Sequence, residues 1–444
     1  MKRLATYGIA AAGMVLMLSG CESWFGESEG DPLPGDRISV LLHERNINSD
    51  PDLAGLEVTL PRPWRNPEWP QAGGDSNHAM HHVEVAAAPK EAWSRDIGDG
   101  ASDKARLLVT PVVADGVIYV MDAKSVVTAY STADGKEIWE VEIAELFPGE
   151  EDDGLFGGGL AVEEGRLYVT TGFAQVLAFD AKSGAEIWRS PTPTPMRAAP
   201  TVRGGRVFVM TVENELFALS AADGSVLWSY IGNPQATSLL GAAAPAVDGG
   251  LVVAAFSSGD LFAFRVDTGS IVWNDALRAV RRTESIANLA DIRGLPVIDR
   301  GRVYAAGHGG VVAAIDLRSG RRFWQAEFVS AQTPWVAGEF IYLLTIENEL
   351  LCITARDGRV KWVSQLPLWE DPEDRKDRIF WTGPVLAGDR LLVGGSDGEA
   401  LAVSPYTGQM LGRQPMPDAV SLPPIVADGS IYFLTDDAEL VSYR

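Results

Sequence analysis

Cysteine is almost absent from this chain, with two in 444 residues. Cys352 lies in the apolar run Leu350–Ile353, and the other cysteine, Cys21, falls near the N-terminus, so Cys352 has no partner for an intramolecular disulfide. A lone thiol in an apolar strand is far more often buried and unreactive than nucleophilic. We therefore expect neither a structural disulfide nor cysteine-based catalysis.

Basic residues are also scarce. The chain has 37 Lys and Arg against 60 Asp and Glu, a formal net charge of −23. Such a balance disfavours nucleic-acid binding, because phosphates require a basic surface. The apolar share of 46%, with 46 Gly and 13 Trp, argues against disorder and favours a large core with many tight turns. The length allows two or three ordinary domains or one large repeat fold.

Long apolar runs are missing as well. The run from about Leu4 to Leu18 is too short for a transmembrane helix. It follows the basic pair Lys2-Arg3 and precedes Cys21, an arrangement typical of a secretory signal. The Leu-Ser-Gly before Cys21 resembles the lipobox of bacterial lipoproteins, in which the cysteine carries the lipid. We predict a signal peptide over 1–20 and lipidation of Cys21. Glu22 follows the cysteine, rather than the Asp that resembles an inner-membrane retention signal in enteric bacteria, so we predict anchoring to the outer membrane, facing the periplasm.

The segment after the predicted cleavage site shows little hydrophobic periodicity. Residues 21–63 are acidic and contain scattered Pro and Gly. Such a composition is typical of a flexible segment. We expect 21–63 to be an acidic tether and 64–444 to form the folded body.

The body repeats itself. Seven segments begin and end at equivalent residues 28 positions apart, and each contains four short runs of alternating apolar residues separated by turn signals. This pattern predicts four-stranded antiparallel blades of a β-propeller. The segments are Pro111–Trp139, Leu160–Trp188, Pro200–Trp228, Pro245–Trp273, Pro296–Trp324, Pro334–Trp362 and Pro384–Gly412.

An eighth segment starts at Pro424 and reaches the last residue, Arg444, after three strands. A fourth strand is available at the other end of the repeats, around Trp93. Pairing it with the last segment would close the ring and remove an exposed edge. We predict an all-β, eight-bladed β-propeller closed by the N-terminal strand. Seven blades is the alternative, because Gly412 replaces the tryptophan in one copy.

The stretch "AFDAKSGAEIW" at 178–188 combines polar residues that suggest either a ligand loop or a hairpin turn. The position equivalent to Gly184 is glycine in all seven segments, whereas the position equivalent to Asp180 is an arginine, Arg265, in one of them. A ligand would not be replaced by arginine, while a hairpin needs a glycine with positive φ. We interpret the stretch as a turn.

Tryptophan recurs at the end of the fourth strand, where a large ring is expected to pack between adjacent blades. We predict a structural rather than a ligand-stacking role for this tryptophan ring. Its members are Trp93, Trp139, Trp188, Trp228, Trp273, Trp324 and Trp362.

The pattern Ala-x-Asp-x-x-Ser/Thr-Gly-x-x-x-Trp at 178–188 and 314–324 resembles the tryptophan-docking motif of the quinoprotein (PQQ-like) propellers. Together with the lipobox, the "WPQAGG" of 69–74 and the terminal closure, it makes the chain similar to the BamB-type lipoproteins of the outer-membrane β-barrel assembly (BAM) machinery. The resemblance covers about 64–444 and implies a non-catalytic scaffold with no cofactor. It also implies binding to the periplasmic POTRA region of a BamA-like barrel protein and contact with unfolded outer-membrane protein substrates.

A catalytic function is the alternative, because quinoprotein dehydrogenases share the repeat. They resemble one another in a vicinal cysteine pair over the cofactor, which this chain lacks. No Ser/His/Asp set stands at recognisable spacing, so we name no catalytic residue. A quinoprotein-like dehydrogenase and a propeller that binds a ligand in its central channel both stay open as alternatives.

Two clusters resemble metal sites only weakly. His78, His81 and His82 include a His-x-x-His spacing, but no Cys or carboxylate is in step with it. The acidic run 150–153 lacks the alternating oxygen ligands of a calcium loop. We interpret the histidines as part of a structural N-terminal segment and the acidic run as a solvated loop, and we predict no metal.

The link 274–295 gathers four arginines in an acidic chain. A basic cluster of this kind can steer and fix a partner, and a solvated loop balancing nearby acids is the open alternative. The resemblance adds the link before Pro245, with Leu240 standing where the family has Arg and Arg293 where it has a second Asp. The candidate partner-binding residues are Leu239, Leu240, Arg278, Arg281, Arg282, Glu284, Asp291 and Arg293.

Overall fold

The computed structural model describes residues 47–102, 105–147, 157–233, 235, 241–278 and 291–444. Residues 48–444 form one compact unit, and the other unit, Met1–Ile47, lies almost wholly outside the described residues. Within the described part no helix is long and apolar enough to cross a membrane. The described residues include two short 3-10 helices, η1 (Pro51–Leu53) and η2 (Ala144–Leu146).

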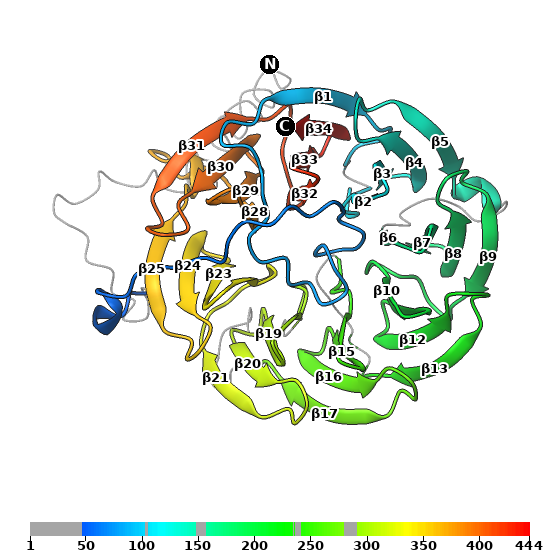
Figure 1. Cartoon of the computed structure of the whole chain (residues 1–444), viewed down its shortest axis with the longest axis horizontal. Coiled ribbons are helices and arrows are strands. Elements are labelled where there is room, and N and C mark those ends of the chain that lie inside the picture. Colours follow the sequence, from blue (N-terminus) through cyan, green and yellow to red (C-terminus); the bar gives the residue numbers. More distant parts are fainter. Residues whose placement is uncertain (1–46, 103–104, 148–156, 234, 236–240, 279–290) are drawn as a thin grey trace, which may run out of the picture. The chain divides into compact units, whose positions relative to one another are not determined.

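Eight four-stranded antiparallel sheets surround a central axis, which confirms the eight-bladed propeller and rejects the seven-bladed alternative (Figure 1). Blade 1 comprises β2 (Val112–Ala114), β3 (Val117–Met121), β4 (Val126–Ser131) and β5 (Glu137–Glu142). Blade 2 comprises β6 (Gly158–Glu163), β7 (Arg166–Thr171), β8 (Gln175–Asp180) and β9 (Glu186–Pro191). Blade 3 comprises β10 (Thr201–Arg203), β11 (Arg206–Met210), β12 (Glu215–Ser220) and β13 (Val226–Ile231).

The next three blades follow the same order from the axis outward. Blade 4 comprises β14 (Ala246–Asp248), β15 (Leu251–Ala255), β16 (Asp260–Arg265) and β17 (Ile271–Ala276). Blade 5 comprises β18 (Val297–Asp299), β19 (Arg302–Ala306), β20 (Val312–Asp316) and β21 (Arg322–Ala326). Blade 6 comprises β22 (Trp335–Ala337), β23 (Phe340–Leu344), β24 (Glu349–Thr354) and β25 (Val360–Gln365).

A small hairpin, β26 (Trp369–Asp371) with β27 (Lys376–Arg378), separates blades 6 and 7. Blade 7 comprises β28 (Trp381–Ala387), β29 (Arg390–Gly395), β30 (Glu399–Val403) and β31 (Met410–Pro415). Blade 8 comprises β32 (Ile425–Ala427), β33 (Ser430–Leu434), β34 (Glu439–Tyr443) and, as its outermost strand, β1 (Glu91–Asp96). The N-terminal strand therefore closes the ring, with Arg95 opposite Leu440, as predicted.

The repeated turn holds each blade to the one before it. At 178–188, Asp180 accepts hydrogen bonds from the backbone N–H groups of Lys182 and Ser183, and Gly184 has φ +70°. This confirms the interpretation of the stretch as a turn. A Cβ at Gly184 would lie 2.8 Å from the ring of Trp139 in the preceding blade, so only glycine lets that ring lie flat on the turn.

The same contact occurs at every member of the tryptophan ring. The indole N–H of each donates to a backbone carbonyl in the turn of the next blade. The acceptors, in the order Trp93 to Trp362, are Thr132, Ala181, Ala221, Val266, Leu317, Ala355 and Pro405. Burial of a large ring with its N–H satisfied accounts for a tryptophan rather than a phenylalanine at these positions.

The compact unit begins at Asn48, before the predicted start of the folded body at Trp64. In the predicted tether, the carboxylates of Asp50 and Asp52 lie 2.7 and 3.0 Å from Arg359. Lys361 donates to the carbonyl of Leu53. Residues 50–54 therefore lie along the start of β25 in blade 6. Residues 21–46 and the predicted signal peptide lie outside the described residues.

Candidate functional site: the central channel

Residues 64–83, called the strap below, run around the inside of the ring (Figure 1). The strap meets the innermost strand, or the residue just after it, in all eight blades in turn. Asn66 bonds to Val426 and Asp428 of blade 8, and Val83 ends the circuit on Leu386 and Gly388 of blade 7. The contacts between these ends join Trp69 to Val113, Pro70 to Val162, Gln71 to Val202, Ser76 to Val247, Asn77 to Ile298 and His81 to Trp335.

The three histidines of the strap have separate structural partners. His78 Nδ1 lies 2.7 Å from the carbonyl of Pro296, and His82 Nδ1 lies 2.9 Å from that of Pro61. His81 Nε2 lies 3.4 Å from Asp299. Among the described residues, no group of three or more His, Cys, Asp or Glu side chains is placed to hold a metal ion. His78 and His81 therefore attach the strap to blade 5, whereas His82 bonds to Pro61, just before the strap, and accepts the backbone N–H of Asp389 after β28 in blade 7.

His78 is fully buried, and this decides its charge. Burial lowers its pKa to about 4, opposed by the bond to Pro296 and by the charge of Asp75. The ring is therefore neutral at neutral pH, and a proton on Nδ1 suits donation to the carbonyl. Its Nε2 has no hydrogen-bond partner among the described residues.

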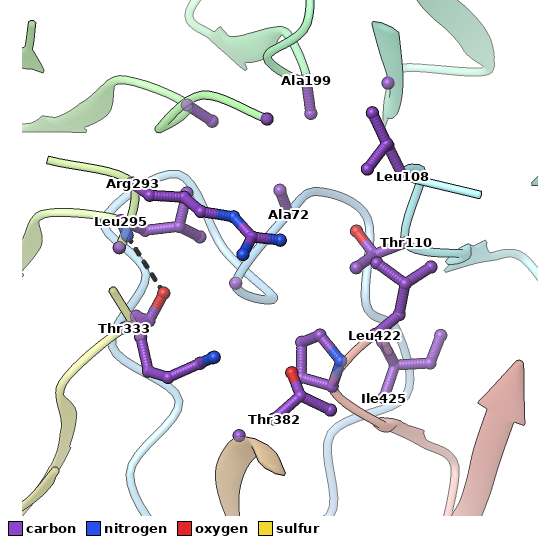
Figure 2. A pocket seen from close by; sticks show the side chains of 18 of the residues that line it. Ala72, Leu108, Thr110, Ala199, Arg293, Leu295, Thr333, Thr382, Leu422 and Ile425 are labelled. Carbon is purple, nitrogen blue, oxygen red and sulfur yellow. Dashed lines mark hydrogen bonds between the residues drawn. The ribbon is translucent and has the colours of Figure 1, made fainter. Parts of the chain in front are cut away.

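The strap also forms one end of a cavity of about 160 Å³ at the centre of the ring. Trp69, Ala72, Gly73 and His78 line it from the strap. The wall comes from residues at or just before the start of the innermost strand of every blade, among them Thr110, Ala199, Leu295, Thr382 and Leu422 (Figure 2). These residues precede the strap-bonded positions along each strand, so the cavity opens toward the links that join one blade to the next.

Arg293 projects into this cavity (Figure 2). Burial lowers the pKa of its guanidinium, and the charge of Asp291 opposes that shift. An arginine stays charged in proteins, so a partly desolvated cation stands in the channel. Arg197 is the second arginine of the lining, which includes no Asp or Glu among the described residues.

The predicted partner-binding residues separate in the structure. Arg278 is exposed and lies 2.8 Å from Asp260 of blade 4, whereas Asp291 is only 4% exposed and Arg293 faces the channel. The grouping by sequence therefore joins an outer arginine to a channel arginine. Leu239, Leu240, Arg281, Arg282 and Glu284 lie outside the described residues, as does the acidic run 150–153.

Sequence reasoning missed Arg197 and the strap as parts of the channel. Arg197 is a single arginine between blades 2 and 3, and nothing in its sequence context marks it. The prediction for Cys352 is confirmed, because the thiol is free and buried and burial raises its pKa. A neutral buried thiol is a poor nucleophile.

Comparison with known proteins agrees with the architecture. The family model described as "Outer membrane protein assembly factor BamB" matches residues 85–147 and 123–364. The BamB of Salmonella typhimurium (strain LT2) is 30% identical over 365 residues, covering 81% of this chain and 89% of the relative. That of Escherichia coli (strain K12) is 30% identical over 362 residues, covering 81% and 90%.

Two solved structures support the fold. The crystal structure of BamB from Moraxella catarrhalis has a TM-score of 0.69 at 20% identity, covering 80% of this chain and all of that one. The quinohemoprotein alcohol dehydrogenase of Comamonas testosteroni has a TM-score of 0.66 at 15% identity, covering 86% and 81%. At such identity the likeness concerns the propeller alone. Sequence identity across most of both chains, the matching family model and the closed eight-bladed ring together establish that this chain belongs to the BamB family of outer membrane protein assembly factors.

Proposed function

We propose that this protein is a non-catalytic scaffold of the outer-membrane β-barrel assembly machinery. The observation that carries the proposal is its identity of 30% with BamB proteins over most of the length of both chains. In this role it binds the POTRA region of a BamA-like barrel protein and aids the insertion of outer-membrane proteins. The lipid on Cys21 holds it at the periplasmic face of the outer membrane.

The uses of the reactive side chains support a scaffold over an enzyme. Each strap histidine contacts a backbone carbonyl or a carboxylate, and the thiol of Cys352 is buried within a blade. A quinoprotein-like dehydrogenase, the other candidate, is favoured only by a likeness of fold. Fold alone does not carry activity, because unrelated functions share one propeller architecture.

The docking surface in this proposal is the face that carries the links before β14 and β18. These links belong to adjacent blades, and their described ends, Gly241 and Asp291, lie together beside Arg197. Leu239 and Leu240 fall in the first link and Arg278, Arg281, Arg282 and Glu284 in the second. An arginine cluster on a chain of net charge −23 steers an acidic partner surface toward one face.

The test is capture of the partner from membranes. The full chain, tagged at its C-terminus, is extracted in mild detergent and the proteins that co-purify are identified. We expect a large β-barrel protein with periplasmic POTRA domains. A partnerless protein carrying a quinone chromophore would overturn the scaffold proposal.

A charge-reversal pair locates the docking face. Arg281→Glu with Arg282→Glu is expected to reduce captured barrel protein at least tenfold, because rim charges act on association and orientation. The matched control, Arg318→Glu with Arg321→Glu, makes the same charge change on the β20–β21 turn at the outside of blade 5. Equal capture by both variants would exclude the link as the docking site.

A further inference from the structure

The channel cavity described above has the attributes of a small-molecule site. It is closed by the strap at one end, and all eight blades contribute to its wall. A cavity of about 150 Å³ lined by apolar side chains holds a benzene molecule in a well-studied case. The 160 Å³ here therefore suit one six-membered ring or a chain of similar bulk.

The wall is chemically two-sided. Leu108, Ala199, Leu422 and Ile425 give an apolar lining on one part (Figure 2). Arg293 enters from the opposite part, where the hydroxyl of Thr333 already accepts the N–H of Leu295. A ligand that fits both parts has a compact apolar body and one anionic group.

The guanidinium of Arg293 is the natural anchor for that group. No hydrogen bond or ion pair joins it to another side chain in the described part of the chain, although the charge of Asp291 acts on it. A half-buried cation without a bonded partner is costly, and a carboxylate that accepts two parallel N–H bonds removes much of that cost. The planar guanidinium of arginine can donate two parallel N–H bonds to a carboxylate, which the ammonium group of a lysine cannot do.

We propose that the central channel binds a small monocarboxylate with a compact apolar body. The carboxylate lies on Arg293, and the body packs against the apolar wall above Ala72 of the strap. This function is additional to the scaffold role and does not depend on it. In this proposal the strap forms part of a binding site in addition to holding the blades together.

The experiment is calorimetric titration of the full chain, purified in a non-ionic detergent, with benzoate as the probe. Benzamide, which has the same ring and no charge, is the matched ligand control. We expect benzoate to bind at least tenfold more tightly than benzamide. Equal affinities, or no heat with either, would overturn the proposal.

Three variants assign the site. Arg293→Gln is expected to lower benzoate affinity at least tenfold, while Arg318→Gln, on the outer turn of blade 5, leaves it unchanged. Ala72→Leu keeps every charge but fills the cavity from the strap, so it is expected to abolish binding (Figure 2). Thermal unfolding and circular dichroism show whether each variant retains the fold. Unchanged benzoate affinity in folded Arg293→Gln or Ala72→Leu would overturn the assignment.

The same variants distinguish a small-molecule site from a site at which the channel binds a side chain of the partner protein. If Arg293→Gln lost the barrel protein in capture while the wild type bound no benzoate, the arginine would serve a partner's acidic side chain. That result would overturn the proposal and leave the scaffold function intact. Loss of benzoate binding with capture unchanged would support the proposal and separate the two functions.

Discussion

Seven of the eight junctions between blades are fastened from the outside by a tryptophan, and the junction between blades 7 and 8 is not. At each of the seven, an indole lies on a turn glycine of the next blade and donates its N–H to that turn. At the eighth, Gly412 occupies the tryptophan position of β31, and a Cβ built there would touch nothing within 4 Å.

The missing tryptophan has a physical reason. The docking glycine always lies between the third and fourth strands of the receiving blade. In blade 8 these strands, β34 and β1, come from opposite ends of the repeats and are joined by backbone bonds between Lys90 and Arg444. No hairpin turn exists there, so a tryptophan on β31 would have no glycine to lie on.

The strap fastens this seam from the inside instead. It begins on blade 8 at Asn66 and ends on blade 7 at Val83. Its two ends then pair with each other, since Trp64 N donates to the carbonyl of His82 and Glu84 N to that of Trp64. The propeller is thus held closed in two ways. Tryptophans fasten seven junctions at the outside of the ring (the rim), and the strap fastens the junction between blades 7 and 8 at its centre (the hub).

The largest expected effect on stability comes from removing a tryptophan at one of the seven rim junctions. Trp188→Ala is predicted to lower the free energy of unfolding by about 3–5 kcal/mol, the usual cost of deleting a buried large aromatic. Urea unfolding followed by fluorescence measures it. Leu411→Ala on β31, whose side chain is 55% exposed, is the control and should change stability by no more than about 0.5 kcal/mol.

The next largest effect concerns His78 of the strap and the dependence of folding stability on pH. The pKa of His78 is lowered to about 4, so the folded state prefers the neutral ring while the unfolded chain titrates near 6.5. Its contribution is present above about pH 6.5 and is lost as the pH falls toward about 4, by roughly 3 kcal/mol. Urea unfolding at pH 7.5 and 4.5 measures the loss.

His78→Gln should remove most of this pH dependence. A pH dependence that persists in His78→Gln would show that other groups govern the acid response of the fold.

The smallest expected effect concerns the seam itself. Gly412→Trp restores the repeat pattern in sequence, but the new ring meets no turn glycine, so it should change the free energy of unfolding by no more than about 0.5 kcal/mol. Urea unfolding measures the change. A gain of several kcal/mol would contradict the explanation given for the missing tryptophan.

The periodic part of the molecule was predictable because each blade solves the same packing problem with the same residues. The interval of 28 residues, the turn glycine and the tryptophan recur together, and the incomplete last copy indicated how the ring closes. The strap was not predictable in this way. Each of its residues meets a different blade, so no two positions face the same environment and no period results.

The arginines illustrate a second limit. Arg278 and Arg293 belong to one basic link in the sequence, yet one pairs with Asp260 at the outer part of blade 4 and the other enters the channel. Distance along a link does not give distance in space, because a link spans from an outermost to an innermost strand. Only the placement of β17 and β18 separates the two roles.

The order of contacts along the N-terminal part has a mechanical consequence. A pull on the chain at Asn48 is met first by Arg359 and Lys361 of blade 6, and next by the strap bonds, beginning with those of Trp64 to His82 and Glu84 and then those of Asn66 to blade 8. Only when the strap has been stripped from the blades does the load reach β1, the strand whose loss would open the ring. Tension applied to the chain at Asn48 therefore falls on the strap before it reaches the blades, and β1 is the last of these elements to bear it.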